Sequence, residues 1–170
     1  MTHDHTTATI RRAMPDDADA LARLRWEFRA GIGAARETEA AFTARCALWM
    51  RARLGHGPWR AWVMEVRGEM VGTAWLELIE KMPNPVTEFE VHGYITNVYL
   101  RPEMRGRGAG SRLLATVLEE CAAQGVHAAI LWPTERSRAL YARFGFEDRG
   151  PVMIRTWDAA HVAEELATAG

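Results

Sequence analysis

The sequence predicts an α/β (α+β) fold in which a mixed, mainly antiparallel sheet is flanked by helices. The apolar periodicity changes along the chain in the order β-α-α-β-β-β-α-β-α-β. A strand, helix and strand follow one another from Tyr94 to Trp132, and this crossover makes its two strands parallel. A tight-turn signal at Arg67-Gly68-Glu69 instead joins two strands as an antiparallel hairpin, because Gly68 can adopt a positive φ.

Each element of the first half has a start or stop signal. Pro15-Asp16-Asp17 begins a helix with apolar positions at Leu21, Leu24 and Phe28. The next helix carries its apolar stripe from Phe42 to Leu54 and ends at glycines and a proline. The expected elements are a strand at 8–13, a helix from 15 to about 31, a helix at 39–54, and strands at 61–66 and 70–79.

The second half begins with the proline-containing loop Lys81–Pro85, which cannot continue a sheet interior. An extended run then leads to a glycine-rich turn and an amphipathic helix that ends at Gly125. Thr134 is a candidate N-cap for the next helix. The expected elements are strands at 88–100, 126–132 and 152–157, with helices following Gly110 and Thr134.

The length of 170 residues and a hydrophobic content of 48% suit one globular domain with its own core. We expect a flexible N-terminus at 1–7, a single domain at 8–158 and a helical C-terminal tail at 159–170. Cys46 and Cys121 lack metal-ligand spacing, which predicts reduced thiols and no metal site.

The charge balance narrows the classes of partner. Lysine and arginine number 21 against 22 acidic residues, a formal net charge of −1, which argues against a nucleic-acid partner. No apolar run reaches the roughly 18 residues of a membrane helix, so no membrane partner is expected. The polar start lacks a signal-peptide pattern, so we expect a cytoplasmic protein.

The segment from Tyr94 to Leu114, YITNVYLRPEMRGRGAGSRLL, is the most informative in the chain. It joins a strand to a helix through closely spaced glycines, which let backbone N–H groups approach an anion at the helix N-terminus. Four arginines stand here against the single acid Glu103. A pyrophosphate fits this pattern, although neither a dinucleotide fingerprint nor a P-loop is present.

Two motifs together resemble a known family. Arg105-x-x-Gly108-x-Gly110, after a strand and before a helix, resembles the acyl-CoA signature of the GNAT superfamily of N-acetyltransferases. Leu140-Tyr141, followed after three residues by Gly145-Phe146, resembles the second signature of that superfamily. The similarity in element order extends from about residue 8 to residue 157, and it implies a GNAT-like sheet with a strand splay that holds acyl-CoA.

The resemblance also implies roles for individual residues. Tyr141 would lie near the thioester sulfur as general acid, whereas the residues alone favour a core tyrosine on the apolar face of its helix. Thr134 stands where many members carry an asparagine that contacts pantetheine, with helix N-capping as the equal alternative. The strand backbone at Val98, Tyr99 and Leu100 would pair with the pantetheine arm. The pyrophosphate site would comprise Arg105, Gly106, Arg107, Gly108, Ala109, Gly110 and Ser111.

A general base is missing from its usual places in the family, because the strand from Tyr94 to Leu100 has no carboxylate. Residues near the acceptor side that could serve instead, through water, are Glu77, Glu80, Glu88, Glu90 and His92. The loops at 31–37 and 81–90 would determine the acceptor. Most of the seven tryptophans should pack in the core or at its rim, and a minority could line the acceptor site.

We therefore predict an enzyme that moves an acetyl group from acetyl-CoA to a primary amine by direct attack, with a small-molecule amine as acceptor and no metal. Two alternatives remain open: a non-catalytic acyl-CoA-binding or sensing module, and a peptide or protein N-acetyltransferase. The sequence leaves the acceptor, the acyl length and the oligomeric state open, a homodimer included.

Overall fold

The computed structural model describes residues 8–30, 36–86 and 90–147. Within these ranges one five-stranded sheet has the order β1-β2-β3-β4-β5. The first three pairings are antiparallel and the pairing of β4 with β5 is parallel, as the crossover through α3 requires. The α/β (α+β) fold class, with a mixed and mainly antiparallel sheet, is therefore confirmed. The expected last strand at 152–157, the N-terminal segment 1–7 and the tail at 159–170 lie outside the described residues.

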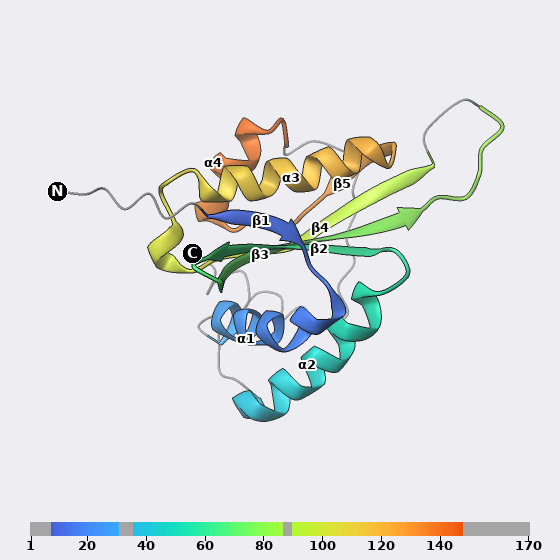
Figure 1. Ribbon diagram of the computed structural model, residues 1–170. Helices are drawn as coiled ribbons and strands as arrows, with labels where there is room; N and C mark the ends of the chain where they lie inside the picture. Colours follow the sequence, from blue (N-terminus) through green and yellow to red (C-terminus); the bar gives the residue numbers. More distant parts are fainter. Residues whose placement is uncertain (1–7, 31–35, 87–89, 148–170) are drawn as a thin grey trace.

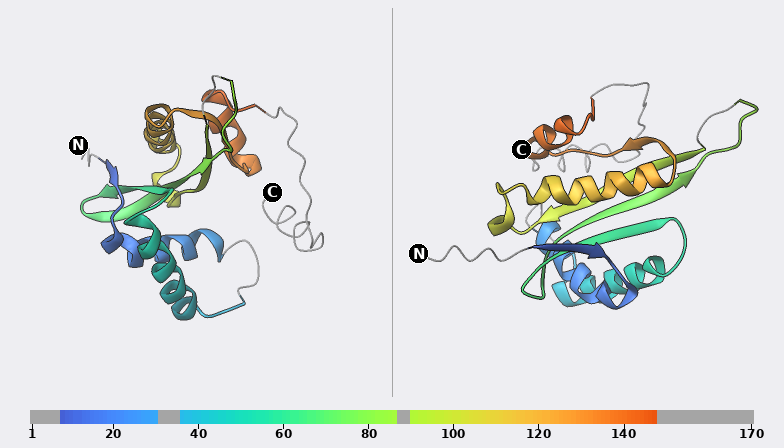
Figure 2. Two further views of the ribbon diagram at one scale, coloured as in Figure 1. Left: turned by 90° about the vertical axis from the view of Figure 1, so that its right-hand side faces the viewer. Right: turned by 45° about the horizontal axis from the view of Figure 1, so that its top comes forward.

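The helices cover the two faces of the sheet, as Figures 1 and 2 show. On one face lie α1 and α2, and on the other lies α3, with α4 beside it. The element bounds are β1 Thr9–Arg12, α1 Ala18–Arg29, α2 Glu39–Leu54, β2 Trp59–Val66, β3 Glu69–Glu80, β4 Val91–Leu100, α3 Ala109–Ala123, β5 Val126–Ile130 and α4 Glu135–Arg143.

The observed bounds agree with the expected ones for α2 and differ by a few residues elsewhere. Pro15–Asp17 form a 3-10 turn, so the α-helix itself starts at Ala18 rather than at Pro15. Strand β2 begins two residues earlier than expected, at Trp59, because Trp59 pairs with Glu77. Strand β5 ends at Ile130 instead of Trp132. The predicted hairpin turn is present, with positive φ at both Arg67 (52°) and Gly68 (78°).

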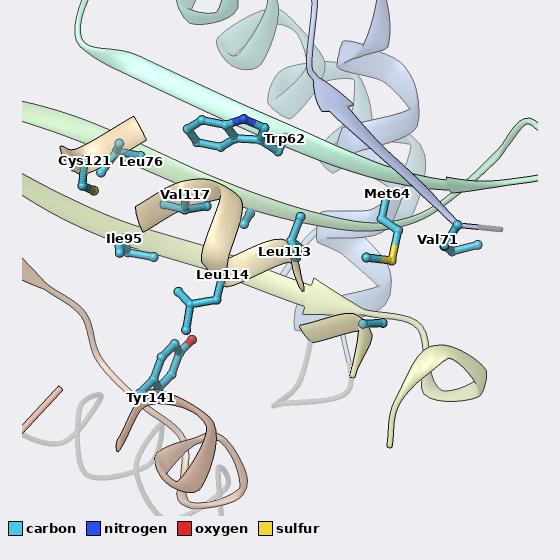
Figure 3. Packing of buried hydrophobic residues seen from close by; sticks show 13 residues of the cluster. Trp62, Met64, Val71, Leu76, Ile95, Leu113, Leu114, Val117, Cys121 and Tyr141 are labelled. Carbon is cyan, nitrogen blue, oxygen red and sulfur yellow. The ribbon is translucent and has the colours of Figure 1, made fainter. Parts of the chain in front are cut away.

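In the described residues two apolar clusters form the core, one on each face of the sheet. The cluster under α3 contains Leu113, Leu114 and Val117 against Leu76 and Ile95 (Figure 3). The cluster under α1 and α2 contains Leu21, Ala47, Met50, Val63 and Trp75. Alternate residues of β2 and β3 serve the two clusters, which is the period-2 burial expected of a sheet covered on both faces.

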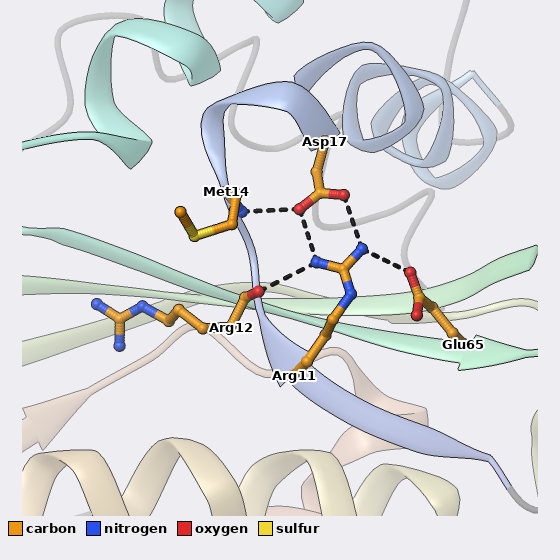
Figure 4. Close-up of polar contacts among 5 residues, drawn as sticks. All are labelled: Arg11, Arg12, Met14, Asp17 and Glu65. Carbon is orange, nitrogen blue, oxygen red and sulfur yellow. Dashed lines mark hydrogen bonds and ion pairs between the residues drawn. The ribbon is translucent and has the colours of Figure 1, made fainter. Parts of the chain in front are cut away.

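A polar contact fixes the start of α1 to the sheet. Arg11 forms two hydrogen bonds of 2.8 Å to the carboxylate of Asp17 and one of 2.6 Å to Glu65 (Figure 4). Asp17 also accepts a hydrogen bond of 2.7 Å from the backbone N–H of Met14. Its pKa is held below its usual value, mainly by the Arg11 hydrogen bonds. The network links β1 and β2 to the turn that leads into α1.

Candidate active site

The glycine turn between β4 and α3 is arranged to receive an anion. Gly106 and Gly108 have φ of 73° and 76°, left-handed values that favour glycine. Gly108 is the N-cap of α3 and provides no side-chain cap, so the first N–H groups of the helix, at Ala109, Gly110 and Ser111, stay available. A Cβ placed on Gly106 or Gly108 would meet no described atom within 4 Å. The turn therefore faces open space.

The arginines near this turn are more engaged than the sequence suggested. Arg101 forms ion pairs with Glu27 (2.9 Å) and Glu69, two acids that are distant in sequence. Arg112 donates to the carbonyl of Ala8 at 2.8 Å. In the sequence these arginines stand against Glu103 alone. Because folding brings Glu27 and Glu69 to Arg101, the net positive charge near the turn is smaller than the local sequence implies. Arg107 is exposed beside the glycines.

The side chain of Arg105, expected to contact the phosphates, is directed back toward β4. Its Nε donates to the carbonyl of Leu100 at 3.0 Å, and its guanidinium lies 5.9 Å from the centre of the Tyr99 ring. In this position Arg105 connects the end of β4 to the turn. Its contribution to anion binding stays a prediction.

The strand splay that the sequence analysis expected is visible in the pairing of β4 with β5. Residues Val91 to Tyr94 pair with β5, and the register ends at Tyr94 opposite Ile130. From Ile95 to Leu100, β4 has no strand partner on this side among the described residues. Backbone N–H and C=O groups along this edge can pair with an extended ligand, as an added strand would. Val98 and Leu100 lie on this part of β4 and pack against the α3 cluster.

A β-bulge in β4 is a feature that the sequence analysis missed. Thr73 pairs with Tyr99 and Trp75 pairs with Thr96, so Ala74 faces both Asn97 and Val98. Asn97 has φ of 51°, a left-handed value that asparagine tolerates better than most residues. The extra residue moves Tyr99 to the α1 face, where its ring stacks on Phe28 at 5.2 Å. In the sequence, the signal for this bulge was Asn97, an asparagine within a run of residues that favour strands.

Arg25 on α1 contacts the bulge directly. Its Nη1 donates to Oδ1 of Asn97 at 3.2 Å, over a separation of 72 residues. This contact joins the helix layer to the point where the β4 backbone changes direction. Periodicity could not have indicated it, because a charged residue on a helix has no preferred partner in sequence.

Tyr141 projects from α4 into the cluster under α3. It is 8% exposed, its ring contacts Phe146 edge-on at 5.8 Å, and its hydroxyl points toward Leu114 (Figure 3). Burial raises the pKa of Tyr141 to about 12. The phenol is therefore protonated at neutral pH and can act as a proton donor.

The structure brings part of the predicted site together. Tyr141, Ala109, Val98 and Leu100 belong to one packed cluster. A Cβ on Gly110 would lie 3.6 Å from Leu100 and 3.5 Å from Leu140, the neighbour of Tyr141. The glycine turn, the end of β4 and the start of the second signature therefore meet.

Thr134 is at the N-cap of α4. Its backbone N–H donates to Oγ of Ser137 at 2.9 Å, and its hydroxyl lies 3.0 Å from the same oxygen. The N-capping alternative is thus present in the structure. The pantetheine contact stays a prediction.

The candidate bases have different surroundings. Glu77 lies on β3 directly opposite Tyr94, whereas Glu80 lies three residues further along, opposite Val91. His92 stacks on His127 at 5.9 Å, and Glu90 is exposed. Glu88 and residues 31–35 of the first specificity loop lie outside the described residues.

The part of the chain that the structure describes contains no group of three or more His, Cys, Asp or Glu side chains placed to hold a metal ion. Within the same residues, no helix has both the length and the apolar composition needed to cross a membrane.

The sheet with its splay, the uncapped helix after a glycine turn and the buried tyrosine together define an acyltransferase of the GNAT type. The model of the Acetyltransferase (GNAT) family matches residues 19–146, and the chain belongs to this family. The family resemblance inferred from the two motifs is therefore confirmed, and the protein is an acetyltransferase.

Known proteins agree with this assignment. Phosphinothricin N-acetyltransferase of Streptomyces coelicolor is 33% identical over 123 residues, 66% of this chain and 69% of that protein. An uncharacterized N-acetyltransferase of Archaeoglobus fulgidus is 29% identical, covering 78% of this chain and 88% of the relative.

Solved structures show the same fold. A GCN5-related N-acetyltransferase from Ralstonia eutropha has a TM-score of 0.72 at 31% identity, covering 88% of this chain and 98% of its own. A predicted acetyltransferase from Clostridium acetobutylicum, solved with acetyl-CoA, has a TM-score of 0.77 at 21% identity, covering 91% of this chain and 99% of its own.

Enzymes of the GNAT family use acetyl-CoA, and the residues present here fit such a co-substrate. The uncapped N-terminus of α3 can accept a pyrophosphate, and the open space at Gly106 and Gly108 leaves room for it. The edge of β4 from Ile95 to Leu100, which has no strand partner among the described residues, can accept the extended pantetheine arm between this turn and Tyr141.

Proposed function

We propose that the protein transfers an acetyl group from acetyl-CoA to a primary amine of a small molecule, by direct attack of the amine on the thioester. The observation that carries this proposal is the position of the glycine turn. Its uncapped helix N-terminus lies beside the unpaired edge of β4, and the buried Tyr141 lies in the cluster behind both. This arrangement supports binding of acetyl-CoA with its pyrophosphate at the glycine turn, its pantetheine arm along β4 and its thioester near Tyr141.

Acetyl-CoA supplies an acetyl group that is activated as a thioester. A backbone N–H near the bulge of β4, at Val98 or Tyr99, would polarise the thioester carbonyl. The nitrogen lone pair of the amine then forms the new C–N bond as the C–S bond breaks. The amine loses its extra proton to water, directly or with Glu90 or His92 as a relay, since β4 has no carboxylate.

Tyr141 would donate its hydroxyl proton to the departing sulfur and regain a proton from water. Its pKa of about 12 ensures that the proton is present but makes the phenol a weak acid toward a thiolate. The contribution of Tyr141 should therefore be near the lower end for general acids, about 10²-fold.

The acceptor is tested by measuring CoA release with a panel of amines. The panel should include phosphinothricin, because the S. coelicolor relative carries that name, together with primary monoamines, polyamines, aminoglycosides and peptides. We expect release well above the rate without acceptor for a small amine. Release with peptides alone would indicate a peptide or protein acetyltransferase. Saturable acetyl-CoA binding without release for any acceptor would indicate a sensing module.

A further inference from the structure

A carboxylate on the α1–α2 face of the sheet stands in a row of aromatic side chains. In the strand register, Glu77 on β3 lies opposite Trp59 on β2 and opposite Tyr94 on β4. Directly opposed residues of antiparallel strands project to the same face with Cβ atoms about 5 Å apart. Trp75, two residues before Glu77, packs with Trp59 in the α1–α2 cluster, which fixes the face.

Glu77 has no ion pair or hydrogen bond with any residue that the structure describes. Its side chain is half-buried. This contrasts with two other half-buried acids that contact the sheet: Glu65 pairs with Arg11, and Glu120 with Arg12 and Arg60. A partly desolvated carboxylate without a partner favours the approach of a cation.

Aromatic rings lie on both sides of Glu77. On one side the ring centre of Trp59 lies 5.2 Å from that of Trp49 and 6.1 Å from that of Trp75. Trp49 already has a cation–π contact, because the guanidinium of Arg53 lies 4.1 Å from its ring centre. On the other side Tyr94 contacts Trp132 edge-on at 5.3 Å. Trp132 is 60% exposed, an unusual exposure for so large an apolar side chain. The Tyr94–Trp132 pair is thus the side that is accessible to a further cation.

The location of the row connects it to the reaction site. Tyr94 is the last residue of β4 that pairs with β5, so the row crosses the sheet where the splay begins. A group bound against Glu77 and Tyr94 would lie at the entrance to the unpaired edge of β4.

We propose that Glu77, Tyr94 and Trp132 form the binding site for the ammonium group of the acceptor. The Glu77 carboxylate would accept N–H hydrogen bonds, and the aromatic rings would contribute cation–π attraction. The site selects cationic amines, which at neutral pH are the major form of the acceptor. The bound ammonium loses a proton to water before its nitrogen lone pair can attack the thioester. This proposal rests on the proposed function, because it assigns the acceptor side of that reaction.

The direct test is binding of a cation that cannot react. Tetramethylammonium is titrated into the protein while the indole N–H signals are followed by NMR, and tert-butanol serves as an uncharged probe of similar size. We expect tetramethylammonium to shift the Trp132 signal with saturation. Glu77→Gln should weaken its affinity about tenfold, and Trp132→Leu should weaken it by several-fold. Glu119→Gln removes the same charge from the exposed side of α3 and should change nothing.

Equal tetramethylammonium affinity in the wild-type protein and Glu77→Gln would overturn the proposal. Equally strong binding of tert-butanol would overturn it as well, because the site would then be merely apolar. Circular dichroism of each variant confirms that the fold is unchanged.

Kinetics separate this proposal from the proposed function. In the CoA-release assay, Glu77→Gln should raise the KM for the amine about tenfold and leave acetyl-CoA affinity unchanged. Acetylation with equal KM in Glu77→Gln and Glu119→Gln would reject the ammonium site and keep the function. Glu77-dependent tetramethylammonium binding without acetylation of any amine would keep the site and reject the function.

Discussion

The two faces of the sheet are built from different kinds of side chain. Under α3 the buried residues are mostly aliphatic, and Leu113, Leu114 and Val117 are fully buried. Under α1 and α2 the sheet has tryptophans, the nearby bulge at Asn97 and the carboxylate of Glu77, which no described residue pairs with. Two polar atoms there, Oγ1 of Thr73 and Nε1 of Trp75, are buried without a hydrogen-bond partner among the described residues.

From this difference we infer that the two faces have different roles, one in binding the co-substrate and the other in binding the acceptor. The α3 face packs against the glycine turn and Tyr141, whose separation must match the distance between the pyrophosphate and the thioester of the proposed co-substrate. The α1–α2 face contains buried polar groups and exposed aromatics, and we expect these to lower the stability of the fold, as is typical of a face that binds a substrate. Substitutions on the two faces should therefore affect different measurements.

The largest effect is expected at the glycine turn. In Gly108→Trp the side chain would fill the open space where the pyrophosphate is expected, and acetyl-CoA binding should become undetectable by calorimetry. Gly108→Ala is the matched control, because it imposes the same left-handed backbone cost of about 1 kcal/mol with little added bulk. Tetramethylammonium binding should be unchanged in both variants. Equal acetyl-CoA affinity in a folded Gly108→Trp variant would show that the turn is not the binding site.

Tyr141→Phe should reduce kcat about 10²-fold while acetyl-CoA affinity changes little, because the ring packing is kept and the hydroxyl is lost. Since the pKa of Tyr141 is raised to about 12, its deprotonation should cause no fall in the wild-type kcat below about pH 10. Phe144→Leu, which also alters an apolar contact of α4, controls for packing. An unchanged kcat in a chemistry-limited assay would assign the proton transfer to water.

The pH dependence tests whether the acceptor side contains a strong base. For an amine of pKa near 9, kcat/KM should rise about tenfold per pH unit between pH 6 and 8, as the neutral amine becomes more abundant. Glu90→Gln and His92→Ala should each lower the rate only modestly. A plateau below about pH 7 that one of these substitutions removes would identify a dedicated base instead.

Arg25→Met tests the contact between the two layers. It keeps the side-chain stem but removes the guanidinium that holds Asn97, so the β4 backbone near Val98 should lose its fixed orientation. We expect kcat to fall about tenfold with acetyl-CoA affinity nearly unchanged, since positioning errors act mainly on the reaction step. Arg23→Met on the exposed side of α1 is the control. Equal kcat in the two variants would show that the bulge needs no support from Arg25.

The sequence predicted the α3 side of the molecule better than the α1–α2 side. Glycine spacing and the Leu140-Tyr141 motif depend on local geometry, so they predicted the glycine turn before α3 and the helix that carries Tyr141. The role of Tyr141 near the thioester stays a prediction. Strand periodicity predicted the sheet, but it could not reveal the bulge at Asn97, which changes the face of Tyr99. Contacts such as Arg25 with Asn97, or Arg101 with Glu27, join residues more than 70 positions apart and have no local signal.

The smallest effect is expected from Thr73→Val, which tests whether a buried polar group on the α1–α2 face lowers the stability of the fold. The Thr73 hydroxyl is fully buried and has no hydrogen-bond partner among the described residues, so its desolvation is uncompensated. Valine has nearly the same shape and suits a strand equally well. We therefore expect the free energy of unfolding, measured by urea denaturation, to rise by about 1 kcal/mol with an unchanged slope.

On α3 the hydroxyl of Thr116 instead donates to the carbonyl of Arg112 at 3.1 Å, so Thr116→Val should bring no such gain. A loss of stability in Thr73→Val would mean that its hydroxyl is bonded after all, and that the polar groups of this face stabilise the fold rather than weaken it.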